Sequence, residues 1–268
     1  MHLSLTLPTL LLATTSIAQA RGAHKRRGRD ADPVQSVPGG SAIDFTTFDS
    51  RKTTTDAFLN EHGYMRSDYT IESDGVAGSI SRRFEPSNVD IVDGALRLKV
   101  KGQTGRGTIS CGEIESYNAF RYGTLETIAK ATPVEGVCQG IFYYEGDNNE
   151  IDIELLSSYY TKGYKQYLSA GVQFTNQATV VGGQSSTLGQ PYGFDPTADF
   201  HNYTITWTPT ATLFYIDGEL RNEFNTNVPG VDAKIIFNNW ANGDPMWSAG
   251  PPKEDAYFLI RSFNFTPL

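Results

Sequence analysis

The sequence predicts an all-β protein, a sandwich of two antiparallel sheets. Three observations favour this fold class. Apolar and polar residues alternate with a period of two in several short segments. Gly, Pro and Asn separate these segments, as tight turns require. There is no long amphipathic helical pattern, so repeated βαβ units with a parallel sheet are disfavoured.

The expected elements follow one another from residue 41 onward. A short helix is expected over residues 53–62, and Gly63 would end it. The dipeptide Asp217-Gly218, between two apolar runs, is the strongest hairpin signal in the chain. The segments expected to be strands are 96–100, 203–207, 214–220, 234–238 and 257–265.

Composition and charge exclude several classes of protein. The chain has 268 residues, of which 39% are hydrophobic and 12% aromatic, so it suits one globular domain and is not disordered. A net charge of -8 argues against a nucleic acid or an anionic membrane as the main partner. Two cysteines are too few for a disulfide scaffold or a cysteine-ligated zinc site. Without internal repeats, residues 41–268 are expected to form a single domain.

The N-terminal region is expected to direct the protein out of the cell. Residues 1–20 lack Lys, Arg, Asp and Glu and end in the small-x-small sequence Ala18-Gln19-Ala20, which predicts a signal peptide. Residues 21–40 form a basic and Pro/Gly-rich leader with a dibasic processing site at Lys25-Arg26-Arg27. Cleavage after Arg27 would remove four basic residues and no acidic ones, taking the net charge from -8 to -12. No later segment reaches the roughly 18 consecutive apolar residues that a membrane span requires. We therefore expect a protein secreted to the cell exterior or the cell wall.

Secretion adds expectations about modification. Asn202 and Asn264 begin Asn-x-Thr sequons and are expected to be glycosylation sites. In an oxidising compartment, Cys111 and Cys138 either form one disulfide or remain free buried thiols.

An acidic strand near the middle of the chain carries the most chemical information. Glu150, Asp152 and Glu154 alternate with aliphatic residues, so a strand would place the three carboxyls on one face. Like charges side by side destabilise a sheet unless a function needs them there. The alternation alone fits a solvated strand face, a calcium site or a pair of catalytic carboxyls. Calcium is the weaker alternative, because the Asp-x-Asn-x-Asn-Gly spacing is absent.

The spacing of Glu150 and Glu154 sets a condition for glycoside hydrolysis. Retaining enzymes place two carboxyls about 5–5.5 Å apart on either side of the glycosidic bond. On a flat strand, the Cα atoms of these two residues would lie roughly 13 Å apart. Their side chains must therefore converge, as they can on the concave face of a curved sheet. Asp152 between them would hold a proton or hydrogen-bond a neighbour.

The acidic strand resembles the signature of a known enzyme family. Asn149-Glu150-Ile151-Asp152-Ile153-Glu154 resembles the Glu-x-Asp-x-Glu signature of family 16 of the glycoside hydrolases. Its unbulged spacing is that of lichenases, plant xyloglucan-active enzymes and fungal wall-crosslinking transglycosylases. The stretches 111–126, 201–218 and 238–245 resemble the family in the same order. These matches extend over roughly residues 105–265.

The resemblance implies a concanavalin A-like β-jelly roll of two curved antiparallel sheets, with the signature strand in a concave cleft. Glu150 would be the nucleophile, Glu154 the general acid/base and Asp152 the supporting carboxylate. The residues expected to bind the sugar chain are Trp240, Tyr122, Phe120, Glu113, Glu115, Asn238 and, on the acceptor side, Trp247. Rings would stack on the sugar, and carboxylates would accept its hydroxyls. Core packing is the alternative for the aromatic residues, and a surface position is the alternative for the two glutamates.

Two departures from the family pattern limit which properties of the family can be expected of this chain. Asn148-Asn149 stands where many lichenases have Trp-Asp before the first catalytic Glu, so their substrate preference does not transfer. Arg261 stands where lichenases supply an Asp to a structural calcium ion. We therefore expect no metal site, and no cofactor.

Three functions are compatible with the sequence. The leading hypothesis is a secreted, monomeric, retaining endo-β-glucanase that hydrolyses β-1,3- or β-1,4-linked glucan. The second is a cell-wall transglycosylase, in which a sugar acceptor replaces water; residues 239–245 resemble the corresponding part of the fungal crosslinking enzymes. The third is a non-catalytic, lectin-like glucan-binding module, although a pure binder has no need for three crowded carboxylates.

Overall fold

The computed structural model describes residues 39–75, 78–165 and 168–268. The expected signal peptide and the processing site after Arg27 lie outside the described residues. Within the described ranges, no helix is long and apolar enough to cross a membrane.

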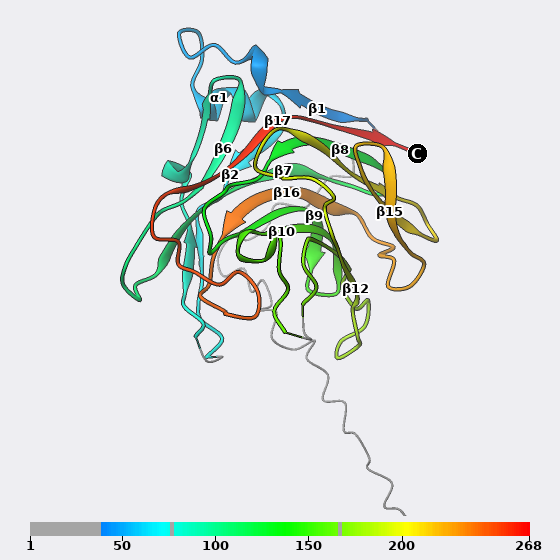
Figure 1. Cartoon of the computed structure of the whole chain (residues 1–268). Coiled ribbons are helices and arrows are strands. Elements are labelled where there is room, and N and C mark those ends of the chain that lie inside the picture. The colour runs from blue at the N-terminus through cyan, green and yellow to red at the C-terminus, as the bar shows by residue number, and fades with distance from the viewer. Residues whose placement is uncertain (1–38, 76–77, 166–167) are drawn as a thin grey trace, which may run out of the picture.

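Two β-sheets make up most of the described chain (Figure 1). The eight-stranded sheet has the order β15 (Glu219–Phe224), β14 (Thr212–Ile216), β13 (His201–Trp207), β8 (Gly123–Lys130), β17 (Ala256–Pro267), β6 (Ala95–Val100) and β5 (Val89–Val92), and β1 (Ser41–Asp44) pairs with β17. The nine-stranded sheet has the order β12 (Ser186–Gln190), β11 (Val172–Asn176), β10 (Asn149–Leu156), β9 (Cys138–Gly146), β16 (Ala233–Trp240), β7 (Ile109–Phe120), β4 (Arg82–Phe84) and β3 (Tyr69–Ile71), and β2 (Tyr64–Arg66) pairs with β7. β4 pairs with β7 in parallel, and the other pairings of the described strands are antiparallel.

The local signals in the sequence correspond to local structure. α1 (Thr55–Glu61) begins after Thr54, whose side chain accepts a hydrogen bond from the Ala57 N–H. Gly63 follows its end with a φ of 81°, a conformation that favours glycine. Asp217 and Gly218 also have positive φ angles and join β14 to β15, as a tight hairpin requires. The 3₁₀ turns of the described chain are η2 (Phe45–Thr47), η3 (Pro86–Asn88) and η4 (Ser157–Tyr159).

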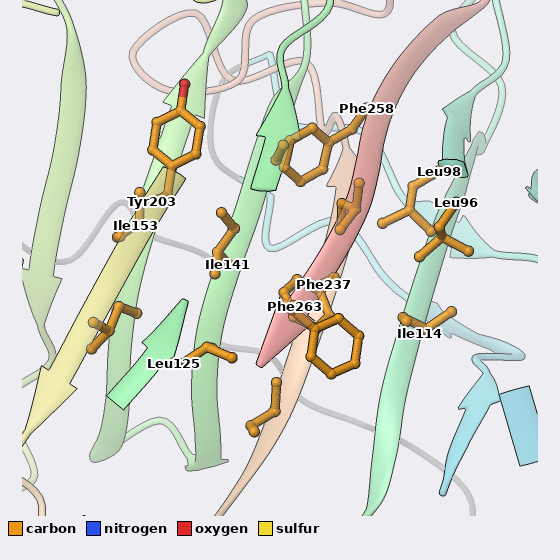
Figure 2. Close-up of a cluster of buried hydrophobic side chains, with 14 of the residues drawn as sticks. Leu96, Leu98, Ile114, Leu125, Ile141, Ile153, Tyr203, Phe237, Phe258 and Phe263 are labelled. Atoms are coloured by element: carbon orange, nitrogen blue, oxygen red, sulfur yellow. The ribbon is translucent and has the colours of Figure 1, made fainter. Parts of the chain in front are cut away.

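The core lies between the two sheets. On β10, the alternation places Ile151, Ile153 and Leu155 in this layer, where they are fully buried. Figure 2 shows the labelled residues Ile114, Ile141, Ile153 and Phe237 of the nine-stranded sheet together with Leu96, Leu98, Leu125, Tyr203, Phe258 and Phe263 of the eight-stranded sheet. Burial of such apolar side chains contributes roughly 1.5–3 kcal/mol each, and the core therefore fixes which way each strand faces.

The opposite face of the nine-stranded sheet carries the acidic residues. We call it the acidic face, defined by Glu113, Glu115, Glu150, Asp152 and Glu154. In Figure 1 the strands form nested arches, with β17 and β8 on the outer side and β9, β10 and β16 on the inner side. The acidic face is therefore the concave one. The predicted all-β sandwich of two curved sheets is confirmed.

Of the two alternatives for Cys111 and Cys138, the disulfide is wrong and the second holds: both thiols are free and buried. The reason is strand order. Trp240 on β16 is opposite Cys138, and its neighbour Asn239 is opposite Gly112, so β16 separates the two cysteines. Two strand spacings are roughly 10 Å, whereas bridged cysteines need Cα atoms within about 7 Å. Burial raises the pKa of the Cys111 thiol to about 12, which keeps it protonated and unreactive.

Unfolding without reductant is expected to expose two thiols per chain. A thiol-specific dye should label few of them in the native protein, because both are buried, and both after denaturation. Cys111→Ser should reduce the denatured count to one. If the denatured wild-type protein showed no free thiol until reductant was added, Cys111 and Cys138 would be joined by a disulfide after all.

Candidate active site

β10 presents three carboxyls in a single row along one strand. Glu150 is opposite Tyr144 on β9, Asp152 is opposite Phe142, and Glu154 is opposite Gly140. Hydrogen bonds from β9 and β11 hold the strand on both sides. The side chains are not solvated, since Glu150 is 7% exposed and Asp152 is 3% exposed. A plain solvated strand face is therefore excluded.

Glu154 is held by donors from two other elements. Trp247 donates its indole N–H to Oε1 at 2.9 Å, and the Cys138 thiol donates to the same oxygen at 3.2 Å. Gln177 places its amide nitrogen 3.5 Å from Oδ2 of Asp152, a long contact. The carboxyls of one strand are thus oriented by residues that lie far away in the sequence.

A second row crosses four strands and ends at Glu154. Glu113 on β7, Asn238 on β16, Gly140 on β9 and Glu154 are successive register partners. The Asn238 amide donates to Oε2 of Glu113 at 3.1 Å, while its Oδ1 has no hydrogen-bond partner among the described residues. A Cβ on Gly140 would lie 2.5 Å from that Oδ1. Glycine at this position therefore keeps space open between Asn238 and Glu154.

Glu113 and Glu115 are both on the acidic face, as expected. Ser67 and Tyr69 donate to Oε1 of Glu113 at 2.7 and 3.0 Å. Glu115 pairs with the Lys234 ammonium at 3.3 Å. The sequence analysis missed Lys234, although the alternation of the strand at 234–238 puts it on the same face as Asn238.

Trp240 lies on the acidic face but is 8% exposed, because Arg82 lies over it. The Arg82 guanidinium carbon is 4.5 Å from the ring centroid, a cation–π contact. Arg82 itself is 3% exposed, and burial lowers the pKa of its guanidinium, while the charge of Glu113 opposes that shift. Sequence reasoning missed Arg82, since nothing in its spacing relates β4 to β16.

Trp247 sits on a loop that its own polar residues shape. Ser248 donates to Oδ1 of Asn242 at 2.8 Å, and the same Oδ1 accepts the Asp244 N–H at 3.1 Å. Asp244 in turn accepts the Met246 N–H at 2.8 Å. Burial raises the pKa of Asp244 above its ordinary value. This loop places the indole against Glu154.

Two expected substrate contacts are wrong. Phe120 packs in the core, with its ring centroid 4.8 Å from that of Phe265. Tyr122 packs edge-on against the buried Trp207, with ring centroids 5.3 Å apart. Period-two phase gives the reason: residue 120 is out of phase with Glu113 and therefore faces the opposite side of β7.

The two sequons lie far from the acidic face. Asn202 on β13 and Asn264 on β17 both line a surface groove of about 380 Å³ on the eight-stranded sheet. Asn264 is exposed, whereas Asn202 is half-buried. Glycans at these positions would leave the carboxyls of β10 accessible.

The residues that the structure describes contain no group of three or more His, Cys, Asp or Glu side chains arranged to hold a metal ion. The chemistry available on the acidic face is that of carboxyl groups in hydrogen bonds. Paired carboxyls on a strand can attack an acetal carbon and transfer a proton to its leaving oxygen.

A curved β-sandwich with such a row of hydrogen-bonded carboxyls on its concave face defines a class of protein, the β-sandwich glycoside hydrolases, which act on O-glycosyl bonds. The sequence profile described as "Glycosyl hydrolases family 16" matches residues 78–255. The chain belongs to this family.

Individual proteins that are similar to this chain include beta-glucanases and a transglycosylase. A beta-glucanase of Paenibacillus polymyxa is 30% identical over 199 residues, which cover 71% of this chain and 79% of that protein. The solved beta-glucanase of Bacillus licheniformis is 23% identical and superposes with a TM-score of 0.66, covering 86% of this chain and 99% of that one. The solved Crh5 transglycosylase is 18% identical, with a TM-score of 0.56, and covers 85% and 84%. The two structural likenesses are evidence of fold.

Gly140→Ala is expected to lower activity without unfolding the protein. The new methyl group would displace the Asn238 side chain, and a shift of about 1 Å at a group of the active site can cost on the order of 10²-fold in rate. The measurement is kcat/KM on β-glucan, with thermal unfolding as the check on stability. Gly105→Ala is the matched control, because nothing lies within 4 Å of a Cβ there. Unchanged activity in Gly140→Ala would show that this space is not needed.

Proposed function

We propose that this chain is a secreted, retaining endo-β-glucanase that hydrolyses β-1,3- or β-1,4-linked glucan as a monomer. The observation that carries the proposal is the concave strand β10, on which the buried Glu150 and the half-buried Glu154 share one face with the buried Asp152 between them. The identity to the Paenibacillus polymyxa beta-glucanase supports glucan as the substrate. A neutral polysaccharide also suits an acidic face that would repel anionic polymers.

In the first step, Glu150 and Glu154 act together on the glycosidic bond. The ionised carboxylate of Glu150 attacks the anomeric carbon, and the protonated carboxyl of Glu154 gives its proton to the departing oxygen. The C–O bond breaks, a glycosyl ester forms on Glu150, and the leaving sugar departs as a free hydroxyl. Asp152, buried between the two, keeps them in different electrostatic environments.

In the second step, Glu154 reverses its role. Its carboxylate takes a proton from water, and the water oxygen attacks the anomeric carbon. The ester to Glu150 breaks, which restores the carboxylate and releases a sugar with the original anomeric configuration.

The residues around β10 are proposed to hold the glucan. Asn238, whose buried Oδ1 has no partner among the described residues and whose amide donates to Glu113, is proposed to border the sugar chain. Trp240, supported by Arg82, bounds the same region. Glu115 is proposed to accept a hydroxyl beside Lys234, and Trp247 to lie on the acceptor side.

Transglycosylation is the second candidate, favoured by the resemblance of residues 239–245 to the fungal crosslinking enzymes. It differs only in the second step, where a sugar hydroxyl replaces water. Incubation of β-glucan with a labelled oligosaccharide separates the two. Labelled polymer with few new reducing ends would favour transfer over hydrolysis, and binding without any turnover would favour the lectin-like module.

Glu150→Gln is expected to abolish turnover while leaving glucan binding intact. The amide cannot form the glycosyl ester, so kcat/KM on β-glucan should fall on the order of 10³-fold or more. Affinity electrophoresis in β-glucan gels measures the retained binding. Glu223→Gln, an exposed acid on β15, is the control and should match the wild type. Activity that survives Glu150→Gln would overturn the assignment of the nucleophile.

The protein recovered from the medium of expressing cells is proposed to begin after Arg27 and to carry glycans on Asn202 and Asn264. N-terminal sequencing and a mass shift on deglycosylation are the measurements. An intact N-terminus at Met1, with all of the protein retained inside the cell, would contradict secretion.

A further inference from the structure

Trp247 and Cys138 both donate to one oxygen of Glu154. We propose that they are positioning residues which hold Oε1 and so fix the orientation of the carboxyl that gives its proton to the leaving sugar. This inference rests on the proposed function, in which Glu154 is the general acid/base. It concerns two residues that do not touch the reacting atoms.

The chemistry of Trp247 and Cys138 makes both of them donors to the Glu154 carboxyl. The indole N–H of Trp247 can donate but not accept, and it lies 2.9 Å from Oε1. The Cys138 thiol is 3.2 Å from the same atom. Burial, followed by the charge of Glu154, raises the pKa of Cys138 well above its ordinary value, so the sulfur keeps its hydrogen. Both groups therefore act as donors, and Oε1 of Glu154 is the acceptor that they share.

The surrounding structure fixes the positions of both Cys138 and Trp247. Cys138 is fully buried on β9, opposite Leu156 on one side and Trp240 on the other. Trp247 is 8% exposed on the loop shaped by Asn242, Asp244 and Ser248. The hydroxyl of Tyr159 also bonds to the Pro245 carbonyl and ties this loop to η4. A general acid needs such support, because small displacements are costly in rate.

The position of the two donors along the strand draws Oε1 in one direction. Cys138 is the register partner of Leu156, two residues beyond Glu154 and on the side away from Glu150. Cys138 therefore holds the carboxyl from the side that lies away from Glu150.

Other titratable and charged groups surround Glu154, while Trp247 and Cys138 donate hydrogen bonds to its carboxyl. Glu150 and Asp152 share the strand, Cys138 and Tyr144 are titratable groups on β9, Glu113 and Glu115 face the row from β7, Arg82 from β4 and Asp244 from the loop. β16 contributes the charged Lys234, which pairs with Glu115, and the neutral Asn238, while β11 contributes the neutral Gln173. Donors stabilise a carboxylate more than a carboxylic acid. Removing one should therefore move the alkaline limb of the kcat/KM profile to higher pH.

The test compares two leaving groups, because a group that acts through the general acid matters only when the leaving oxygen needs a proton. Trp247→Phe keeps the ring and removes the N–H. We expect kcat/KM to fall about tenfold or more on β-glucan and by less than roughly twofold on a dinitrophenyl β-glycoside, with the alkaline limb at higher pH, a shift that loss of an acceptor-side contact would not produce. Glu154→Gln is the benchmark and should show the same dependence with a larger loss.

The second pair of variants examines the thiol. Cys138→Ala should lower kcat/KM on glucan and shift the alkaline limb, while Cys138→Ser, which restores a donor, should recover most of the activity. Cys111→Ala is the matched control, an equally buried thiol whose sulfur contacts the Ile109 carbonyl and no carboxylate. It should leave the profile unchanged.

The outcomes separate the two claims. If Glu154→Gln depends on the leaving group but Trp247→Phe and Cys138→Ala lose equally on both substrates, the positioning role is overturned and the proposed function stands. If the wild type turns over neither substrate, or Glu154→Gln is fully active, the proposed function fails and the positioning role fails with it.

Discussion

The structure depends on one constraint, which is that β10 must satisfy two opposite environments at once. Its aliphatic residues fill the core between the sheets, and its carboxyls occupy the concave face. A slip of one residue would exchange the two sets, placing three acids in the core. The register with β9 and β11 is therefore held by the packing of Ile151, Ile153 and Leu155 as much as by hydrogen bonds. The position of the catalytic groups is a consequence of core packing.

Buried carboxyls need donors, and the neighbouring strands and loops supply them. Glu113 is bound by Ser67, Tyr69 and Asn238, and Glu154 by Trp247 and Cys138. Each donor prevents the cost of an unpaired buried charge. The same contacts fix the geometry of the site before any substrate arrives, which is how an enzyme lowers the cost of orienting its groups.

Local patterns in the sequence were enough to predict the all-β fold, the short helix, the hairpin at Asp217-Gly218 and the shared face of the three carboxyls, because a period of two is a local property. The order of the strands in a sheet is not a local property, and the sequence pattern did not predict it. The insertion of β16 between Cys111 and Cys138, and the position of Arg82 over Trp240, follow from pairings between distant segments. Phe120 was predictable in principle, since its phase relative to Glu113 already points to the core.

The most direct test of the central claim is to trap the covalent intermediate. A 2-fluoro β-glycoside with a good leaving group should form a stable ester on the nucleophile, because the fluorine slows its hydrolysis. Intact mass spectrometry and peptide mapping then locate the sugar. The account predicts one adduct per chain, attached to Glu150 and absent from Glu150→Gln. An adduct on another residue, or turnover that leaves no adduct, would contradict it.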